Sequence, residues 1–206
     1  MSDDILNLSA MQLDAIKEIG NVGAGNSATA LSQLINKKID MDVPNVSIVP
    51  LADVPNLVGG PDTMVASIFL RVYGKAPGSV LFLMPRESAF YLVEHLLGEQ
   101  KSATDGELTE MDQSALMEIG NILAGAYLNA LSYYTKLTLL PSIPAMAIDM
   151  AGAILNVVIV QLGQMGDHAL VIETQFLSED EGISGHFFLV PDVGSLQTIL
   201  NAVGVK

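Results

Sequence analysis

Apolar residues recur at helical spacing in two segments, one near the start of the chain and one near its middle. Ile16 and Leu31 mark the apolar face of the first segment, and Leu116 and Leu131 mark that of the second. Both segments open with a capping-box pattern, in which two side chains three residues apart bond each other's backbone N–H groups. These pairs are Ser9 with Gln12 and Thr109 with Asp112. We therefore predict a long helix at the start of each half.

Runs of β-forming residues follow each predicted helix. Three strands are predicted in each half, at 45–50, 63–73 and 79–84 and then within 145–161, 168–177 and 186–190. A second helix closes each half, over 86–97 and 194–202, and a glycine follows each one. A polar linker at about 98–108 separates the halves. Each half is therefore predicted to run helix, strand, strand, strand, helix.

The two halves also resemble each other in sequence. Shifting the chain by one hundred residues aligns 15–32 with 115–132, where ten of eighteen positions are identical and about one is expected by chance. Pro44 and Pro144 coincide at the same shift. Near the end of each half, 78–85 resembles 184–191. We therefore predict internal repeats over about 9–98 and 109–204.

A unit of this length cannot easily cover both faces of its own sheet. Two copies related by a pseudo-twofold axis would instead share one core. We therefore predict an α+β fold built from a duplicated helix-strand-strand-strand-helix unit, with the long helices packed on a β-sheet. The whole chain, 1–206, is expected to form a single fused domain.

Composition narrows the possible functions. The net charge of −14, from 23 acidic and 9 basic residues, leaves no basic stripe for a nucleic acid and disfavours anionic membranes. The N-terminal residues lack the pattern of a signal peptide, and polar residues interrupt the longest apolar stretch, 143–162, which we predict to form buried strands. We expect a cytoplasmic protein without membrane insertion. Dense surface carboxylates are also typical of life at high salt.

Several kinds of site find no support in the sequence. The chain has no cysteine, and its three histidines show no ligand spacing, so no metal or cofactor of its own is expected. No Gly-Lys-Ser/Thr phosphate loop occurs. The segment 23–28 superficially fits a dinucleotide fingerprint, but helical residues precede it and the second copy lacks it. We therefore reject a dinucleotide-binding site, and an ATPase has no support in the sequence.

One polar stripe recurs in both copies. Asp14, Glu18 and Asn21 fall within an arc of about 60° on a helix, and Gly25 continues the stripe. The equivalent stripe in the second copy consists of Ser114, Glu118, Asn121 and Gly125. We expect both stripes to face away from the core.

A merely solvated face is the alternative explanation for these stripes. Such a face tolerates many residues, yet Glu and Asn recur while the neighbouring Lys17 is replaced by Met117 in the second copy. The small residues beside each stripe have no protruding side chains, so a partner could approach the helix closely. Tight packing between helices is the other explanation for these small residues. The recurrence favours a functional site.

The spacing Asp/Ser-x-x-x-Glu-x-x-Asn, followed after 22 residues by Pro44 or Pro144, resembles that of the CheC/CheX/FliY family of chemotaxis phosphatases. Because it carries two complete motifs in one short chain, the sequence resembles the CheC branch of this family in particular. The resemblance implies hydrolysis of the aspartyl phosphate of the response regulator CheY. It also implies that Mg²⁺ is bound by CheY and not by this chain.

The resemblance assigns a role to each residue of the motif. Asn21 and Asn121 would orient the attacking water, which suits an acyl phosphate because it needs a positioned water more than a strong base. Glu18 and Glu118 would pair with a lysine of the regulator and fix its docking register. The residues that would assist docking at the rim are Asp14, Ser114, Gly25 and Gly125.

A second partner, the deamidase CheD, is also implied by the resemblance. Asp149 is a lone carboxylate in an apolar run and is the candidate residue for this contact; a strand-end carboxylate bonded to backbone amides is the alternative. A non-enzymatic adaptor that binds CheY or CheD is the alternative to a phosphatase. A further alternative is that one copy is catalytic and the other has decayed, although both copies retain Glu and Asn.

Overall fold

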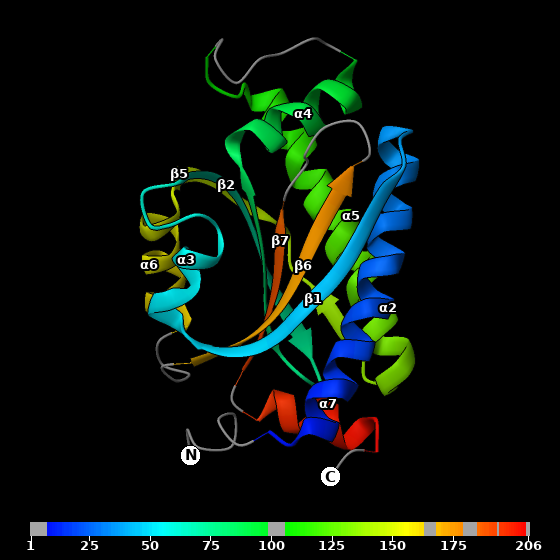
Figure 1. The fold of residues 1–206 in the computed structure, drawn as a ribbon. Coiled ribbons are helices and arrows are strands. Elements are labelled where there is room, and N and C mark those ends of the chain that lie inside the picture. Colours follow the sequence, from blue (N-terminus) through cyan, green and yellow to red (C-terminus); the bar gives the residue numbers. More distant parts are fainter. Residues whose placement is uncertain (1–7, 99–105, 163–167, 179–184, 193, 205–206) are drawn as a thin grey trace.

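The computed structural model describes residues 8–98, 106–162, 168–178, 185–192 and 194–204, and these form three layers. A β-sheet lies in the middle, helices α2 and α5 cover one face, and α3 and α6 cover the other (Figure 1). The helices are α2 Ala10–Ile35, α3 Val54–Leu57, α4 Arg86–Leu97, α5 Glu110–Thr135, α6 Ala151–Leu162 and α7 Ser195–Ala202. The strands are β1 Ile39–Pro50, β2 Met64–Gly74, β3 Gly78–Pro85, β4 Leu139–Pro141, β5 Ala145–Met150, β6 His168–Ser178 and β7 His186–Pro191. The predicted α+β class is confirmed.

Both long helices begin at the predicted capping boxes. Gln12 N–H donates to Ser9 Oγ at 3.3 Å, and Ser9 N–H donates to Gln12 Oε1 at 2.9 Å. Thr109 and Asp112 exchange the same two bonds at the start of α5. These bonds satisfy backbone donors that a helix start leaves without partners inside the helix.

The order of the strands in the sheet is symmetric about its centre. The order is β1-β6-β7-β3-β2-β4, β5 also pairs with β2, and the neighbours are antiparallel. The last strands of the two halves, β3 and β7, pair in the middle, where Leu81 lies opposite Phe188 and Phe82 opposite Phe187. Strand β1 of the first half pairs with β6 of the second half, and β4 and β5 of the second half pair with β2 of the first half. A pseudo-twofold axis between β3 and β7 would produce this order, and the division into two repeats stays a prediction.

The sheet has an apolar core on each face, where we expected a single shared core. Successive side chains of a strand point to opposite faces, and β3 is buried along nearly its whole length. Val80 and Phe82 join the cluster under α2, α4, α5 and α7, whereas Leu81 and Leu83 join a second cluster with residues of α3 and α6. The prediction of one core was therefore incomplete.

The predicted strand within 145–161 is wrong beyond residue 150, because 151–162 form helix α6. Its β-branched residues favour a strand locally, but Ala151, Ile154 and Leu155 are buried at helical spacing against the outer face of the sheet. Tertiary burial therefore overrides local preference. None of the helices among the described residues is long and apolar enough to cross a membrane. Most of the predicted linker, 99–105, lies outside the described residues.

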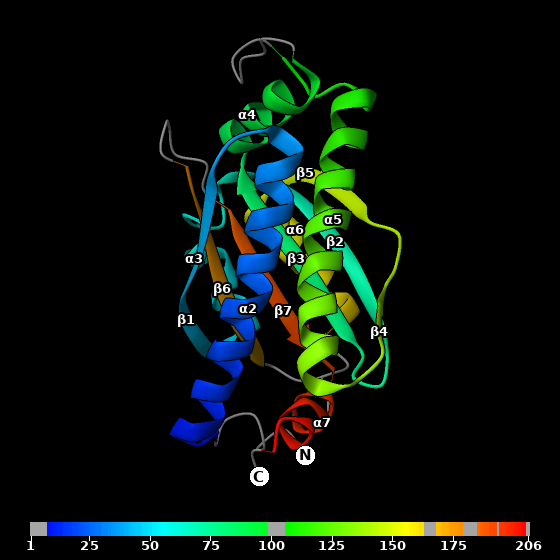
Figure 2. The same cartoon turned by 90° about the vertical axis from the view of Figure 1, so that its right-hand side faces the viewer.

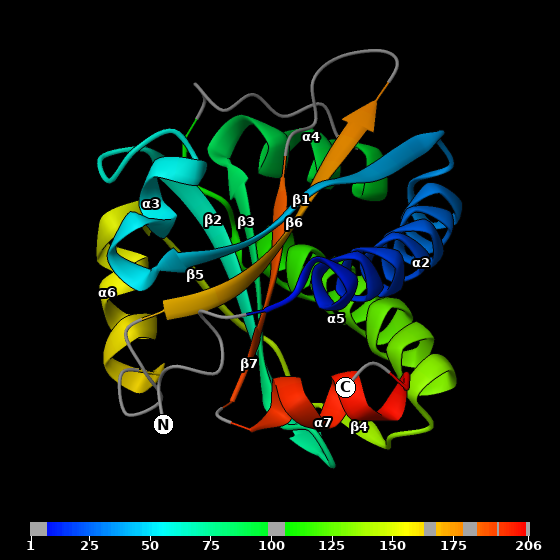
Figure 3. The ribbon, with the colours of Figure 1, turned by 60° about the horizontal axis from the view of Figure 1, so that its bottom comes forward.

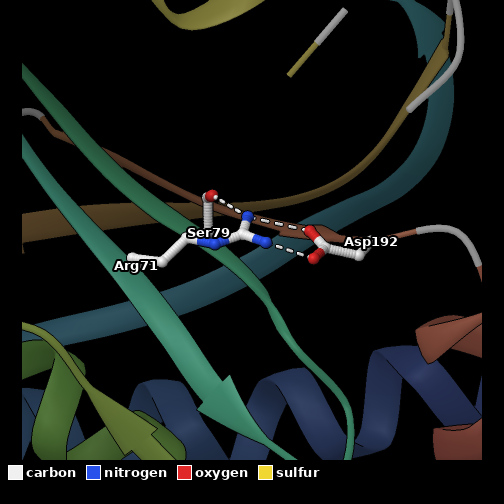
Figure 4. Close-up of polar contacts among 3 residues, drawn as sticks. All are labelled: Arg71, Ser79 and Asp192. Carbon is white, nitrogen blue, oxygen red and sulfur yellow. Dashed lines mark hydrogen bonds and ion pairs between the residues drawn. The ribbon is translucent and has the colours of Figure 1, made fainter. Parts of the chain in front are cut away.

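An ion pair ties the end of β7 to the β2–β3 hairpin (Figure 4). Arg71 Nη1 donates to Asp192 Oδ1 at 2.8 Å and to Ser79 Oγ at 3.0 Å, and Arg71 Nη2 donates to the other oxygen of Asp192. The side chain of Asp192 is only 12% exposed. Its backbone N–H donates to Pro77 O at 3.0 Å. The pair therefore fixes the chain just before α7, across the centre of the sheet.

We predict that Asp192→Ala lowers the free energy of unfolding by about 2 kcal/mol, because the largely buried Arg71 guanidinium loses its counter-ion. Replacing both partners, with Arg71→Met and Asp192→Leu, should restore most of that loss. Denaturant unfolding measures both effects. The control is Asp40→Ala, which breaks the exposed Lys38–Asp40 pair and should change little. Equal losses in Asp192→Ala and Asp40→Ala would contradict the prediction.

Candidate active site

The structure places both predicted stripes on the solvent-facing side of the long helices. Glu18 and Asn21 are exposed on α2, and Glu118 and Asn121 are exposed on α5. Among the described residues, none forms a side-chain hydrogen bond or ion pair with these four. Their amide and carboxylate groups are therefore available to a docking partner.

The predicted rim residues differ in their surroundings. Asp14 and Ser114 are exposed one turn before each Glu. A methyl group added at Gly25 or Gly125 would meet no atom within 4 Å, so both glycines leave the helix surface open. The low surface that we expected beside each Asn is therefore present on both helices.

Asp149 lies apart from the stripes, on strand β5. Its side chain is exposed, and Oδ1 accepts a hydrogen bond from Met150 N–H at 2.8 Å. It borders an apolar groove of about 250 Å³ between β5 and α6, lined by residues that include Phe69, Ile154 and Val157. The structure therefore does not bring Asp149 together with the Glu–Asn pairs.

Helices α2 and α5 lie side by side and run in opposite directions (Figure 2). They approach each other closely where Gly23 faces Tyr127, because a methyl group added at Gly23 would lie 2.5 Å from the Tyr127 ring. Close by, Ser27 Oγ donates to the backbone carbonyl of Leu123 at 2.9 Å, and Ser27 is fully buried. Figure 3 shows the same pair from below, crossing one face of the sheet. These contacts define the helix crossing.

The crossing determines the direction in which each stripe faces. Successive residues of a helix advance by about 100°, so Asn21 lies about 160° around α2 from Gly23. Glu18 lies about 180° around the helix from Ser27. By the same spacing, Asn121 lies on the side of α5 opposite Leu123. Each stripe therefore faces away from the neighbouring helix, and two partners could dock without meeting at the crossing.

Tyr127 anchors the crossing to the sheet. Its ring is fully buried and lies 4.6 Å from the ring of Phe187, centroid to centroid. Its hydroxyl has no hydrogen-bond partner within the described part of the chain, and burial raises the pKa of this hydroxyl, which therefore stays protonated near neutral pH. Positions 27 and 127 coincide when the chain is shifted by one hundred residues, so the exchange of Ser for Tyr there was a sequence signal that we missed.

The chemistry of the stripes is that of orientation and not of nucleophilic attack. An amide both donates and accepts hydrogen bonds, so it can hold a water molecule in one orientation. A carboxylate one turn earlier can pair with a cation of a partner. In the described residues, no three His, Cys, Asp or Glu side chains are grouped so that they could hold a metal ion.

The sequence and the fold both match known chemotaxis proteins. Residues 11–48 match the model of the CheC-like family, and 66–161 match that of the chemotaxis phosphatase CheX. The chain is 42% identical over 199 residues to the CheY-P phosphatase CheC of Bacillus subtilis, with 95% of each chain covered. The chain belongs to the CheC-like family. The matched residues 11–48 of this family member include Glu18 and Asn21.

Solved structures share the fold of this CheC-like protein. The X-ray structure of Thermotoga maritima FliY matches 96% of this chain and 98% of that chain, with a TM-score of 0.77 and 20% identity. A chain of the CheX-CheY-BeF3-Mg²⁺ complex from Borrelia burgdorferi gives a match with a TM-score of 0.54 and 21% identity, covering 82% of this chain and 95% of that chain. At these identities the matches establish the fold alone.

We predict opposite effects for glycines on the two sides of these helices. Gly25→Ala and Gly125→Ala should each raise the free energy of unfolding by up to about 1 kcal/mol, because alanine favours a helix and its methyl group meets open space. Gly23→Ala and Gly120→Ala should lower it, because the added methyl would lie 2.5 Å from Tyr127 and 2.6 Å from Ile68. Denaturant unfolding compares the four variants. A loss of stability in Gly25→Ala would show that its surroundings are not open.

Proposed function

We propose that this protein is a phosphatase that hydrolyses the aspartyl phosphate of the response regulator CheY. The observation that carries the proposal is the exposed Glu–Asn pair, which occurs on both long helices of a CheC-like chain. The similarity to the CheY-P phosphatase CheC of Bacillus subtilis supports the same substrate. We expect the protein to act in the cytoplasm, where it would meet a diffusible regulator.

In the proposed reaction, Asn21 or Asn121 holds a water molecule in line with the phosphorus atom. The water oxygen forms a bond to phosphorus while the bond between phosphorus and the aspartate oxygen breaks. The electron pair of that bond stays on the aspartate carboxylate, and inorganic phosphate leaves. Because the aspartate carboxylate is already a good leaving group, orientation of the water accounts for the catalysis.

Glu18 and Glu118 are proposed to dock the regulator, each through an ion pair with a lysine. Exposed ion pairs contribute little affinity in water, so their role is to set the register in which Asn meets the phosphoryl group. A Mg²⁺ ion held by the regulator would offset the charge of the phosphoryl oxygens. The complex of CheX named above contains CheY and Mg²⁺, which supports this division of labour.

The net charge of −14 gives the chain no general attraction for a phosphorylated partner. Recognition is therefore proposed to rest on short-range contacts along each stripe. Because the two stripes face apart, each is proposed to act independently, with one regulator at each site. A non-enzymatic adaptor would bind the regulator through the same stripes without releasing phosphate.

CheD is the second proposed partner, at a surface that includes Asp149. The exposed position of this carboxylate, beside the apolar groove between β5 and α6, supports the proposal. Its hydrogen bond with Met150 N–H uses one oxygen and leaves the other available. CheD and CheY would then occupy separate surfaces.

We predict that Asn21→Ala or Asn121→Ala alone halves the rate of phosphorylated CheY decay, while the double variant loses about 100-fold. Each single variant keeps one working site, whereas the double variant positions no water. The measurement is phosphate release from phosphorylated CheY. Asn26→Ala is the matched control, since this exposed amide lies on α2 outside the stripe and the second copy carries Ala126. Decay at the parent rate in the double variant would remove the assignment; binding without any phosphate release by the parent protein would indicate the adaptor.

We predict that Asp149→Lys weakens binding of CheD at least about tenfold, because it reverses the charge beside the groove. Isothermal titration with purified CheD measures the change. Glu87→Ala is the control, because Glu87 is an exposed carboxylate on α4, away from the groove. Unchanged affinity in Asp149→Lys would exclude Asp149 from the contact with CheD.

A further inference from the structure

We propose that each asparagine of the candidate active site is positioned by a buried residue of the opposite helix, Asn21 by Tyr127 and Asn121 by Ser27. This inference rests on the proposed function and adds two positioning residues to it. Each positioning residue belongs to the other half of the chain from the asparagine that it supports. A change in the second half should impair the site of the first half, and the reverse.

The Tyr127 ring presses on the back of the helical turn that carries Asn21. Its atoms Cγ, Cδ2 and Cε2 would all lie within 2.9 Å of a methyl group at Gly23, so the ring touches the α2 backbone there. Asn21 projects from the opposite side of the same turn, as the helix geometry requires. Since Tyr127 also packs on Phe187 of β7, the ring transmits the position of the sheet to the turn of Asn21.

A hydrogen bond positions the helical turn that carries Asn121, as the Tyr127 ring does for Asn21. Ser27 Oγ donates to the carbonyl of Leu123, two residues after Asn121 on the opposite side of α5. Both residues are buried, so the bond is shielded from competing water. It fixes the backbone of this turn relative to α2, and Asn121 projects from the turn toward solvent.

The support beneath each asparagine affects the rate because the proposed catalysis depends on the orientation of a water molecule. A misplacement of about 1 Å in a positioned group can cost about 100-fold in rate. A side chain on a helix inherits the position of its turn, because few torsions separate it from the backbone. Loss of the ring or of the hydrogen bond would let one turn shift while the other keeps its support. The expected defect is therefore in kcat and confined to one site.

The experiment uses the full-length protein in two backgrounds, Asn121→Ala, which leaves only the first site, and Asn21→Ala, which leaves only the second. Tyr127→Leu should lower kcat for phosphorylated CheY about tenfold in the first background and less than about twofold in the second. Ser27→Ala should show the reverse preference, with a decrease of about threefold. KM should stay within about twofold throughout, because Glu18 and Glu118 remain in place.

Two further variants separate positioning from loss of stability. Tyr127→Phe keeps the ring on Gly23 and should restore kcat in the first background. Leu155→Ala, in the core on the other face of the sheet, should destabilise the protein without favouring either site. Equal decreases in both backgrounds, or no decrease in folded Tyr127→Leu and Ser27→Ala, would overturn the inference. Parent activity in the Asn21→Ala, Asn121→Ala double variant would instead overturn the proposed function itself.

Discussion

The close crossing of α2 and α5 is the contact on which the arrangement of both candidate sites depends. Two helices approach this closely only where a small side chain leaves room, and Gly23 does so beneath the Tyr127 ring. The same contact fixes the rotation of each helix about its axis. Once Gly23 and Ser27 face α5, helical periodicity turns Glu18 and Asn21 toward solvent. The packing on the buried face of each helix therefore determines which residues its exposed face presents to a partner.

The sheet makes this crossing rigid because both of its faces are covered. Strand β3 contributes Phe82 to the core under the long helices and Leu81 to the core under α3 and α6. A sheet that is buried on both faces deforms little, because close packing on either side resists movement. Tyr127 and Gly120 both bear on this sheet, through Phe187 and Ile68. A site that works by orientation benefits from such rigid support.

Local signals in the sequence were enough to predict much of this fold and the exposed face of the site. The capping pairs, such as Thr109 with Asp112, specify helix starts through bonds within four residues, so they are readable without any tertiary information. Helix α6 was not readable in this way, because Ile154 and Leu155 are buried by strands that lie far away in sequence. The exchange of Ser27 for Tyr127 signals a difference between the two long helices, but it does not identify Gly23 as the residue that the Tyr127 ring contacts.

The difference between positions 27 and 127 gives a physical reason for joining two halves in one chain. If the halves are repeats, an identical pair would place the same residues at both contacts of the crossing. If both helices carried Gly and Ser at these positions, as α2 does, a cavity would remain between them. If both carried Leu and Tyr, as α5 does, the space between them would be overfilled. Either packing fault costs about 1–5 kcal/mol. A fused chain can instead combine Gly23 with Tyr127 and Leu123 with Ser27. Both Glu–Asn pairs then lie exposed on the surface but rest on different contacts beneath it.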